Sequence, residues 1–122
     1  MAFVETDIQD QIIIIKLNRP ERLNALSTVI REGMADAFNK FKDDKNLEVA
    51  ILTGEGRGFC AGEDMKESLE VGSLASAPGK GEEIENPFMN GTLDKPVIGA
   101  INGYAMGGGF MLGIAMTTGG LM

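Results

Sequence analysis

The chain has 122 residues, enough for one small domain, and its 18 acidic residues against 11 basic ones give a formal net charge of −7. This balance argues against a nucleic acid or an anionic membrane as a partner held by bulk charge. The sequence has no histidine and one cysteine, Cys60, which excludes a Ser-His-Asp triad, a Cys-His pair and a Cys/His zinc site.

The start of the chain and the cysteine count bear on the compartment. Residues 1–10 have neither the basic start nor the apolar core of a signal peptide. Cys60 has no second cysteine with which to form a disulfide within the chain, and disulfides are typical of oxidising compartments. We therefore expect a cytoplasmic protein without a metal centre.

Two β-rich runs, residues 3–8 and 11–17, open the chain with Gln9-Asp10 between them. Two such runs joined by a short polar pair predict a hairpin. Residues 12–15 are four consecutive isoleucines, a pattern typical of a strand that is buried on both faces.

A polar loop at residues 18–24 leads into a predicted helix, with Asn24 or Ser27 as its N-cap. Over residues 28–42 the apolar side chains fall on one helical stripe and the charges lie opposite. Residues 47–53 return to strand composition, and the order strand, helix, strand predicts a crossover with parallel pairing, and so an α/β fold. The stripe consists of Ile30, Met34, Ala37, Phe38 and Phe41.

A glycine-rich turn at residues 54–62 follows at the carboxyl end of that strand, where open α/β sheets usually place ligands. It lacks the glycine spacing of a dinucleotide site, because Phe59 stands where the third glycine is needed. Asp64 and Glu67 have the spacing of a capping box, which predicts a short helix over residues 65–71.

The remainder repeats the same order of elements within one domain, residues 1–122. Residues 72–91 mix Gly, Ser, Pro and Glu, which predicts a mobile loop. Residues 97–101 read as a buried strand, and the glycines at 107–109 open a helix over residues 108–116. We expect the two glycine-rich turns to face one another.

Residues 96–122 carry no charge and are long enough to cross a bilayer. Eight glycines and an asparagine lower their hydrophobicity, and no cationic residue follows them. A buried strand followed by a buried helix explains the same apolarity, so we expect no membrane partner.

Three motifs occur in order: NRPERLNAL at residues 18–26, ILTGEGRGFCAGEDMKE at 51–67 and KPVIGAINGYAMGGG at 95–109. Together they closely resemble the crotonase superfamily, the enoyl-CoA hydratase/isomerase family. The resemblance runs from about residue 3 to residue 114, the N-terminal half of a crotonase domain. It implies an α/β, crotonase-like spiral of ββα units, truncated here, and an acyl-CoA thioester as substrate.

The resemblance implies an oxyanion hole made by two peptide N–H groups, those of Glu63 and Gly108. A thioester carbonyl gains negative charge in the transition state, and preorganised N–H donors stabilise that charge. The alternative is that both glycine-rich segments are tight turns that only let a helix and a strand pack closely.

For the coenzyme A moiety, the resemblance implies that the backbone near Ala61 and Asp64 holds the adenine end, with Lys66 and Arg22 near the phosphates. Cations gathered on two loops of an acidic chain suit a polyanion, although they are equally typical of solvated surface. Coenzyme A enters as part of the substrate, so no separate cofactor is expected.

Acid–base chemistry is where the sequence departs from the family pattern. Hydratases of the family carry a glutamate two residues after the glycine triplet, where this chain has Met111. Met111 cannot move a proton, which argues against ordinary hydration. The side chain of Glu63 either replaces the missing catalytic carboxylate or is an exposed glutamate at the start of a helix. The alternative is a non-catalytic truncated fragment that folds or interacts only with a partner. A family-type homotrimer or hexamer is expected only if the chain is completed.

Overall fold

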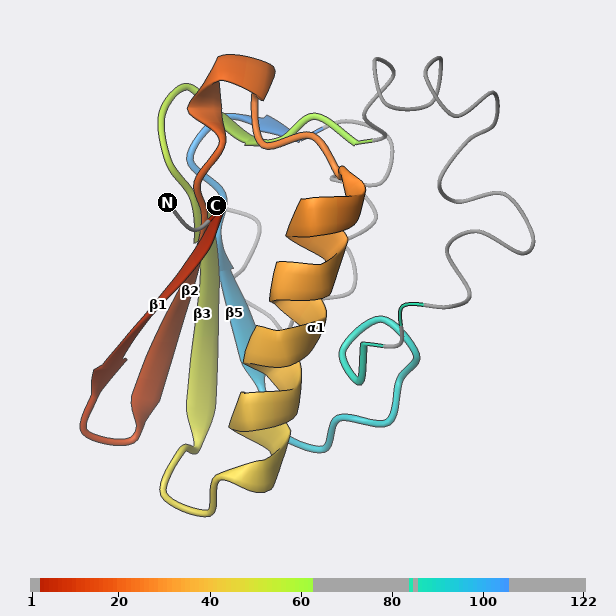
Figure 1. Cartoon of the computed structure of the whole chain (residues 1–122). Helices are drawn as coiled ribbons and strands as arrows, with labels where there is room; N and C mark the ends of the chain where they lie inside the picture. The colour runs from red at the N-terminus through yellow and green to blue at the C-terminus, as the bar shows by residue number, and fades with distance from the viewer. Residues whose placement is uncertain (1–2, 63–83, 85, 106–122) are drawn as a thin grey trace.

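The computed structural model describes residues 3–62, 84 and 86–105 (Figure 1). One four-stranded sheet, in the order β1-β2-β3-β5, is covered on one face by a long helix, and β4 and β6 form a separate two-stranded sheet. The elements are β1 (Val4–Gln9), β2 (Ile12–Leu17), η1 (Pro20–Arg22), α1 (Thr28–Asp43), β3 (Val49–Gly54), β4 (Gly58–Cys60), β5 (Val97–Ala100) and β6 (Tyr104–Ala105).

The topology confirms the predicted α/β order. β1 and β2 form an antiparallel hairpin, which turns at Asp10 in a left-handed conformation (φ 55°). α1 then crosses over the sheet, so that β3 lies parallel to β2, and β5 lies parallel to β3. β1, β2 and α1 are thus one ββα unit.

Helix α1 begins where one of the two predicted caps stands. The hydroxyl of Ser27 accepts a hydrogen bond from the backbone N–H of Ile30, at 3.3 Å. All five side chains of the predicted stripe are buried, together with Ala35, because this face packs on the sheet. Phe38 and Phe41 are fully buried there and lie in the same core as Leu52.

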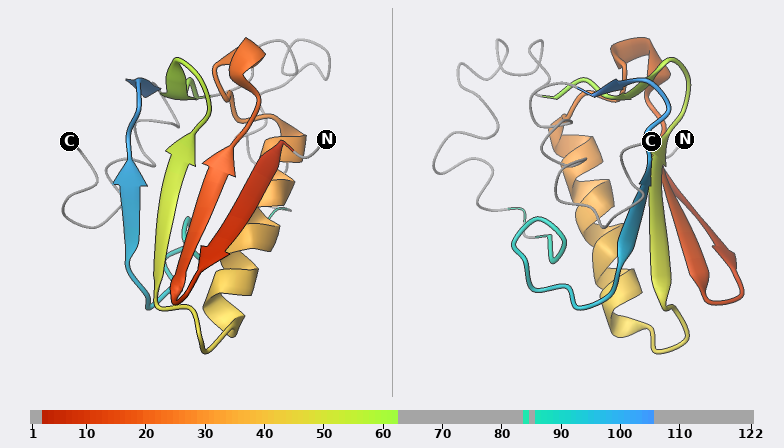
Figure 2. Two further views of the ribbon diagram at one scale, coloured as in Figure 1. Left: turned by 90° about the vertical axis from the view of Figure 1, so that its left-hand side faces the viewer. Right: turned by 180° about the vertical axis from the view of Figure 1, so that it is seen from behind.

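The sheet is covered on one face only by the described elements. Ile13 and Ile15 are fully buried towards α1, whereas Ile12, on the other face, is 39% exposed. The expectation that residues 12–15 are buried on both faces is therefore wrong, since no described element covers the second face (Figure 2, left). On that open face Ile14, Ile51 and Ile98 lie in one row across three strands.

The segment before β5 is fixed to α1. Phe88 stacks on Phe38 with ring centroids 5.0 Å apart. The ammonium group of Lys95 donates to the carbonyl oxygens of Phe41 and Asp44, each at 2.8 Å, where the last carbonyls of a helix lack intrahelical partners. These contacts hold the start of β5 at the carboxyl end of α1.

Candidate functional site

The loops that follow β2, β3 and β5 meet at one end of the sheet, the carboxyl end of its parallel strands (Figure 2). Open α/β sheets bind their ligands at this end. Residues 18–26, the glycine-rich turn at 54–62 and residues 101–105 of the third motif are therefore brought together. The glycines at 107–109 lie outside the described residues, so the expectation that the two glycine-rich turns face one another stays a prediction.

Asn24 fixes the first of these loops to the second. Its side chain is fully buried and its backbone is left-handed (φ 55°). Its amide group donates to the carbonyl oxygens of Glu55 (3.1 Å) and Gly58 (2.8 Å), while its side-chain oxygen accepts from the N–H of Arg19 at 2.7 Å. Asn24 is thus a loop-to-loop connector, whereas the helix cap is Ser27.

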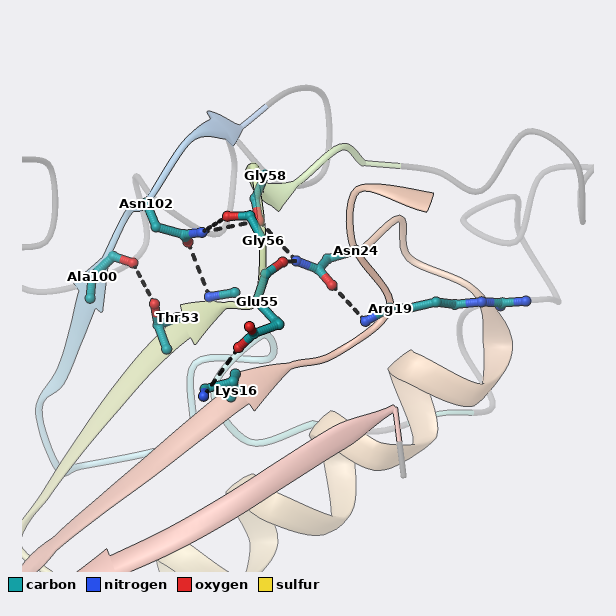
Figure 3. A network of polar contacts seen from close by, with 10 residues as sticks. Lys16, Arg19, Asn24, Thr53, Glu55, Gly56, Gly58, Ala100 and Asn102 are labelled. Atoms are coloured by element: carbon teal, nitrogen blue, oxygen red, sulfur yellow. Dashed lines mark hydrogen bonds and ion pairs between the residues drawn. The ribbon is translucent and has the colours of Figure 1, made fainter. Parts of the chain in front are cut away.

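Asn102 fixes the third loop to the second from the opposite side. Its amide group donates to the carbonyl oxygens of Gly56 (2.9 Å) and Gly58 (3.3 Å), and its side-chain oxygen accepts from the N–H of Gly54 at 3.1 Å. Figure 3 shows the segment 54–58 held between the two asparagines. The carbonyl oxygen of Gly58 accepts from both.

Two glycines make this approach sterically feasible. A β-carbon at Gly103 would overlap the carbonyl oxygen of Arg57. One at Gly54 would lie 2.6 Å from the carbonyl oxygen of Phe59 and 2.7 Å from the side-chain nitrogen of Asn24. The backbone itself therefore packs at this end of the sheet, as glycine permits.

The loops are joined further by a parallel pairing of β4 with β6. Gly58 pairs with Tyr104 and Cys60 with Ala105, with an irregularity between the two positions. The two chain segments consequently leave this ladder side by side and in the same direction. β4 lies within the glycine-rich turn at residues 54–62, and β6 precedes the glycines at 107–109 in the sequence.

Of the six predicted site residues, Arg22 and Ala61 fall within the described residues. Arg22 ends η1, and the neighbouring Leu23 accepts at its carbonyl oxygen a hydrogen bond from the N–H of Ala61, at 3.0 Å. The loop that carries Arg22 therefore lies against the segment that carries Ala61. Glu63, Asp64, Lys66 and Gly108 lie outside the described residues, as does Met111.

Cys60 lies in the core beneath these loops. It is fully buried, and burial raises the pKa of its thiol to about 11, because a thiolate would lose its hydration there; a backbone hydrogen bond at Gly62 and the charge of Arg31 oppose this only in part. A nucleophile needs a thiolate at neutral pH, so Cys60 is a small core residue.

A groove of about 510 Å³ lies elsewhere, between β1 and α1, where Phe3, Val29 and Asp36 are among its lining residues. None of its lining residues belongs to the three loops. Within the described part of the chain, no helix is long and apolar enough to cross a membrane, and no three His, Cys, Asp or Glu residues are grouped to hold a metal ion.

The roles of Asn24 and Asn102 were not predicted from the sequence. Asn24 carries a signal, since asparagine is the residue that most readily adopts the left-handed conformation after glycine. Asn102 precedes Gly103, and Asn-Gly is a typical turn pair. Neither signal reveals that both side chains reach the same carbonyl oxygen.

Comparison with known proteins agrees with the sequence motifs. A family model described as enoyl-CoA hydratase/isomerase matches residues 7–117. The chain is 35% identical to 1,2-epoxyphenylacetyl-CoA isomerase of Escherichia coli over 119 residues, covering 93% of the chain and 45% of that protein. It is 43% identical to carnitinyl-CoA dehydratase of Proteus mirabilis over 107 residues, covering 85% of the chain and 40% of that protein.

Solved structures agree as well. The crystal structure of an enoyl-CoA hydratase from Mycobacterium tuberculosis superposes with a TM-score of 0.76 at 36% identity, over 96% of the chain and 44% of that structure. The expected crotonase-like α/β fold is confirmed. The chain spans less than half the length of each of these relatives.

Proposed function

Since the chain belongs to the enoyl-CoA hydratase/isomerase family, we propose that it binds acyl-CoA and polarises the thioester carbonyl with two peptide N–H groups, those of Glu63 and Gly108. The proposal concerns the binding and polarising step.

The pairing of β4 with β6 is the observation that carries the proposal. Cys60 pairs with Ala105 in a parallel register, and Glu63 and Gly108 each follow one of these residues by three positions. Three residues span at most about 10 Å of extended chain. Both amides therefore start from neighbouring points at the carboxyl end of the sheet, which suits a pair of donors for one oxygen atom.

Polarisation follows from simple electrostatics. When a proton leaves the carbon next to a thioester carbonyl, or a nucleophile adds in conjugation with it, negative charge develops on the carbonyl oxygen. Fixed N–H donors stabilise that charge without reorganising, and the loss of one donor typically costs about 2.7–4 kcal/mol. The chain supplies these donors from its backbone, so it needs no histidine for this step.

Arg22 and Ala61 support a place for coenzyme A on the two loops. The hydrogen bond between Ala61 and Leu23 holds the arginine-bearing loop against the segment that precedes Glu63. Arg57, which is exposed on the same segment, adds a further cation for phosphate groups. We propose that Asp64 and the backbone at Ala61 face the adenine and that Arg22 and Lys66 face the phosphates, with no other cofactor.

Met111 limits which reaction is proposed. No proton can be moved from the position where family hydratases carry a glutamate, so we propose thioester polarisation ahead of ordinary hydration. Lyase or isomerase activity, a trimeric or hexameric assembly and a cytoplasmic location remain proposals for a completed domain that contains residues 1–122, with residues 72–91 as a loop within it.

Calorimetric titration with acetyl-CoA tests the proposal. We expect saturable binding in the millimolar range or tighter, weakened at least threefold by Arg22→Ala and by Lys66→Ala. Lys45→Ala is the matched control. Lys45 is exposed just after the carboxyl end of α1, whereas the loop with Arg22 precedes the other end of this helix, so the substitution should leave the affinity unchanged. The absence of any heat of binding at millimolar acetyl-CoA would contradict the proposal for this chain.

A second candidate function rests on the open face of the sheet. Ile12 and Ile98 are 39% and 38% exposed there, and contiguous exposed apolar residues mark interaction surfaces. A non-catalytic fragment that works only with a partner would use this face. A monodisperse monomer that turns over crotonyl-CoA would rule this candidate out, as size-exclusion chromatography and an activity assay would reveal.

A further inference from the structure

We infer that Asn24 and Asn102 are positioning residues for the oxyanion hole: by sharing the carbonyl oxygen of Gly58, they set the spacing of the two segments that carry its amides. The inference rests on the proposed function and deepens it. Neither side chain is proposed to touch the substrate.

The shared acceptor lies at the start of the ladder that leads to both amides. Gly58 is the first residue of β4 and pairs with Tyr104, the first residue of β6. Its carbonyl oxygen accepts from Asn24 at 2.8 Å and from Asn102 at 3.3 Å. A displacement of either asparagine therefore displaces the first rung of the β4–β6 pairing.

Asn24 is the rigid side of this arrangement. It is fully buried, and both it and Leu23 are held in left-handed conformations, which non-glycine residues keep only where the surrounding structure fixes them. Its backbone N–H donates to the carbonyl oxygen of Arg19, and its side-chain oxygen accepts from the N–H of the same residue. Backbone and side chain are thus fixed together, and the amide group can point only at the segment 54–58.

Asn102 is the adjustable side. Asn102 is exposed and directly precedes Gly103, at the turn into β6. Its side chain contacts the segment 54–58 at Gly54, Gly56 and Gly58. Three hydrogen bonds from one side chain to one segment define both the distance and the rotation of β6 against that segment. Loss of Asn102 should therefore let β6 shift while the buried side keeps its place.

A shift of β6 has a specific chemical consequence. Donors stabilise a developing oxyanion only when both lie within hydrogen-bond distance of the same oxygen. Binding of the coenzyme A moiety depends on other groups of the loops. Replacement of Asn102 should weaken the contact with the thioester carbonyl and leave the affinity for coenzyme A itself nearly unchanged.

The test compares two ligands and two variants. Crotonyl-CoA carries the carbonyl, and S-butyl-CoA is a thioether that lacks it, so the ratio of their dissociation constants reports carbonyl binding alone. Asn102→Ala removes the three contacts. Thr53→Val is the matched control, because it removes a 2.9 Å hydrogen bond between the neighbouring strands β3 and β5, from Thr53 to the carbonyl oxygen of Ala100, without touching Gly58.

We expect Asn102→Ala to reduce the ratio of the dissociation constants, thioether over thioester, at least tenfold. The affinity for S-butyl-CoA should change less than twofold. Thr53→Val should leave the ratio within twofold of the wild type. Without ligand, amide hydrogen exchange in β4 and β6 should be at least tenfold faster in Asn102→Ala, while exchange in α1 stays within twofold.

Two results would overturn the inference. One is an unchanged ratio in Asn102→Ala. The other is faster exchange in α1 to the same degree as in β4 and β6, which would show a general loss of stability. If the wild type binds both ligands equally, the proposed oxyanion hole fails, and the exchange experiment alone then decides whether the asparagines hold the ladder.

Discussion

The side-chain amides of Asn24 and Asn102 converge on one acceptor, the carbonyl oxygen of Gly58, at 2.8 and 3.3 Å (Figure 3). The three loops at the carboxyl end of the sheet are thereby linked through a single backbone atom. Because Asn24 is buried and its polar groups must be paired, it depends on the segment 54–58 as much as that segment depends on it. Several consequences can be measured.

Replacement of Asn24 should be costly in two separable ways. Asn24→Gly keeps a backbone that tolerates the left-handed conformation but removes three side-chain hydrogen bonds, and should lower the free energy of unfolding by about 1–3 kcal/mol. Asn24→Ala should cost about 1 kcal/mol more, because alanine is strained there. Urea denaturation measures the free energy of unfolding of both variants. If both lie within about 0.5 kcal/mol of the wild type, which is about the error of such a comparison, Asn24 does not hold the loops together.

Gly103→Ala should be more damaging than Gly91→Ala. At Gly103 the added carbon overlaps the backbone of Arg57, which cannot move without displacing Gly58, so we expect a loss of about 2 kcal/mol or more. At Gly91 nothing lies within 4 Å, and only the positive φ of 78° opposes alanine, for about 1 kcal/mol. Thermal unfolding of the two variants should rank them in this order, and the reverse order would count against the close approach.

Lys95→Met should destabilise the chain by about 1–2 kcal/mol, because the ammonium group donates to two carbonyl oxygens at the carboxyl end of α1 and lies 5.1 Å from the ring centre of Phe41. Lys45→Met, a change of the same chemistry at an exposed position, should alter stability by less than about 0.5 kcal/mol. Equal effects of the two substitutions in chemical denaturation would show that Lys95 does not hold the helix end.

Cys60 should make the stability of the chain depend on alkaline pH. Its pKa is raised from the ordinary 9.0 to about 11 in the folded chain, so its contribution to stability is fully present below pH 9 and is lost as the pH rises towards 11. The difference in unfolding free energy between the wild type and Cys60→Ala should shrink by roughly 2 kcal/mol between pH 8 and pH 11. A difference that stays constant over this range would mean that the thiol is not buried.

The elements that were predicted correctly are those whose signals are local. The stripe of α1, the cap at Ser27 and the crossover between β2 and β3 follow from spacing within short windows of sequence. The conformation at Asn24 is also a local preference, but its target is not: Gly58 lies on another loop, and the contact depends on three backbone paths at once.

Burial of the sheet was predicted less well, for a related reason. A run of isoleucines indicates a strand, yet the sequence of a strand does not say which elements cover its faces. Ile14 and Ile98 lie in the open row, whereas Ile15 is covered by α1, and this difference depends on elements far away along the chain.

Carbon-13 NMR of crotonyl-CoA labelled at the thioester carbonyl tests most directly whether two backbone amides of the chain polarise that carbonyl. Hydrogen bonds to the oxygen withdraw electron density from the carbonyl carbon, so the resonance should move downfield when the ligand is saturated with the chain. The shift should be smaller with Asn102→Ala than with Thr53→Val. A bound ligand whose carbonyl resonance stays at its value in water would contradict the claim.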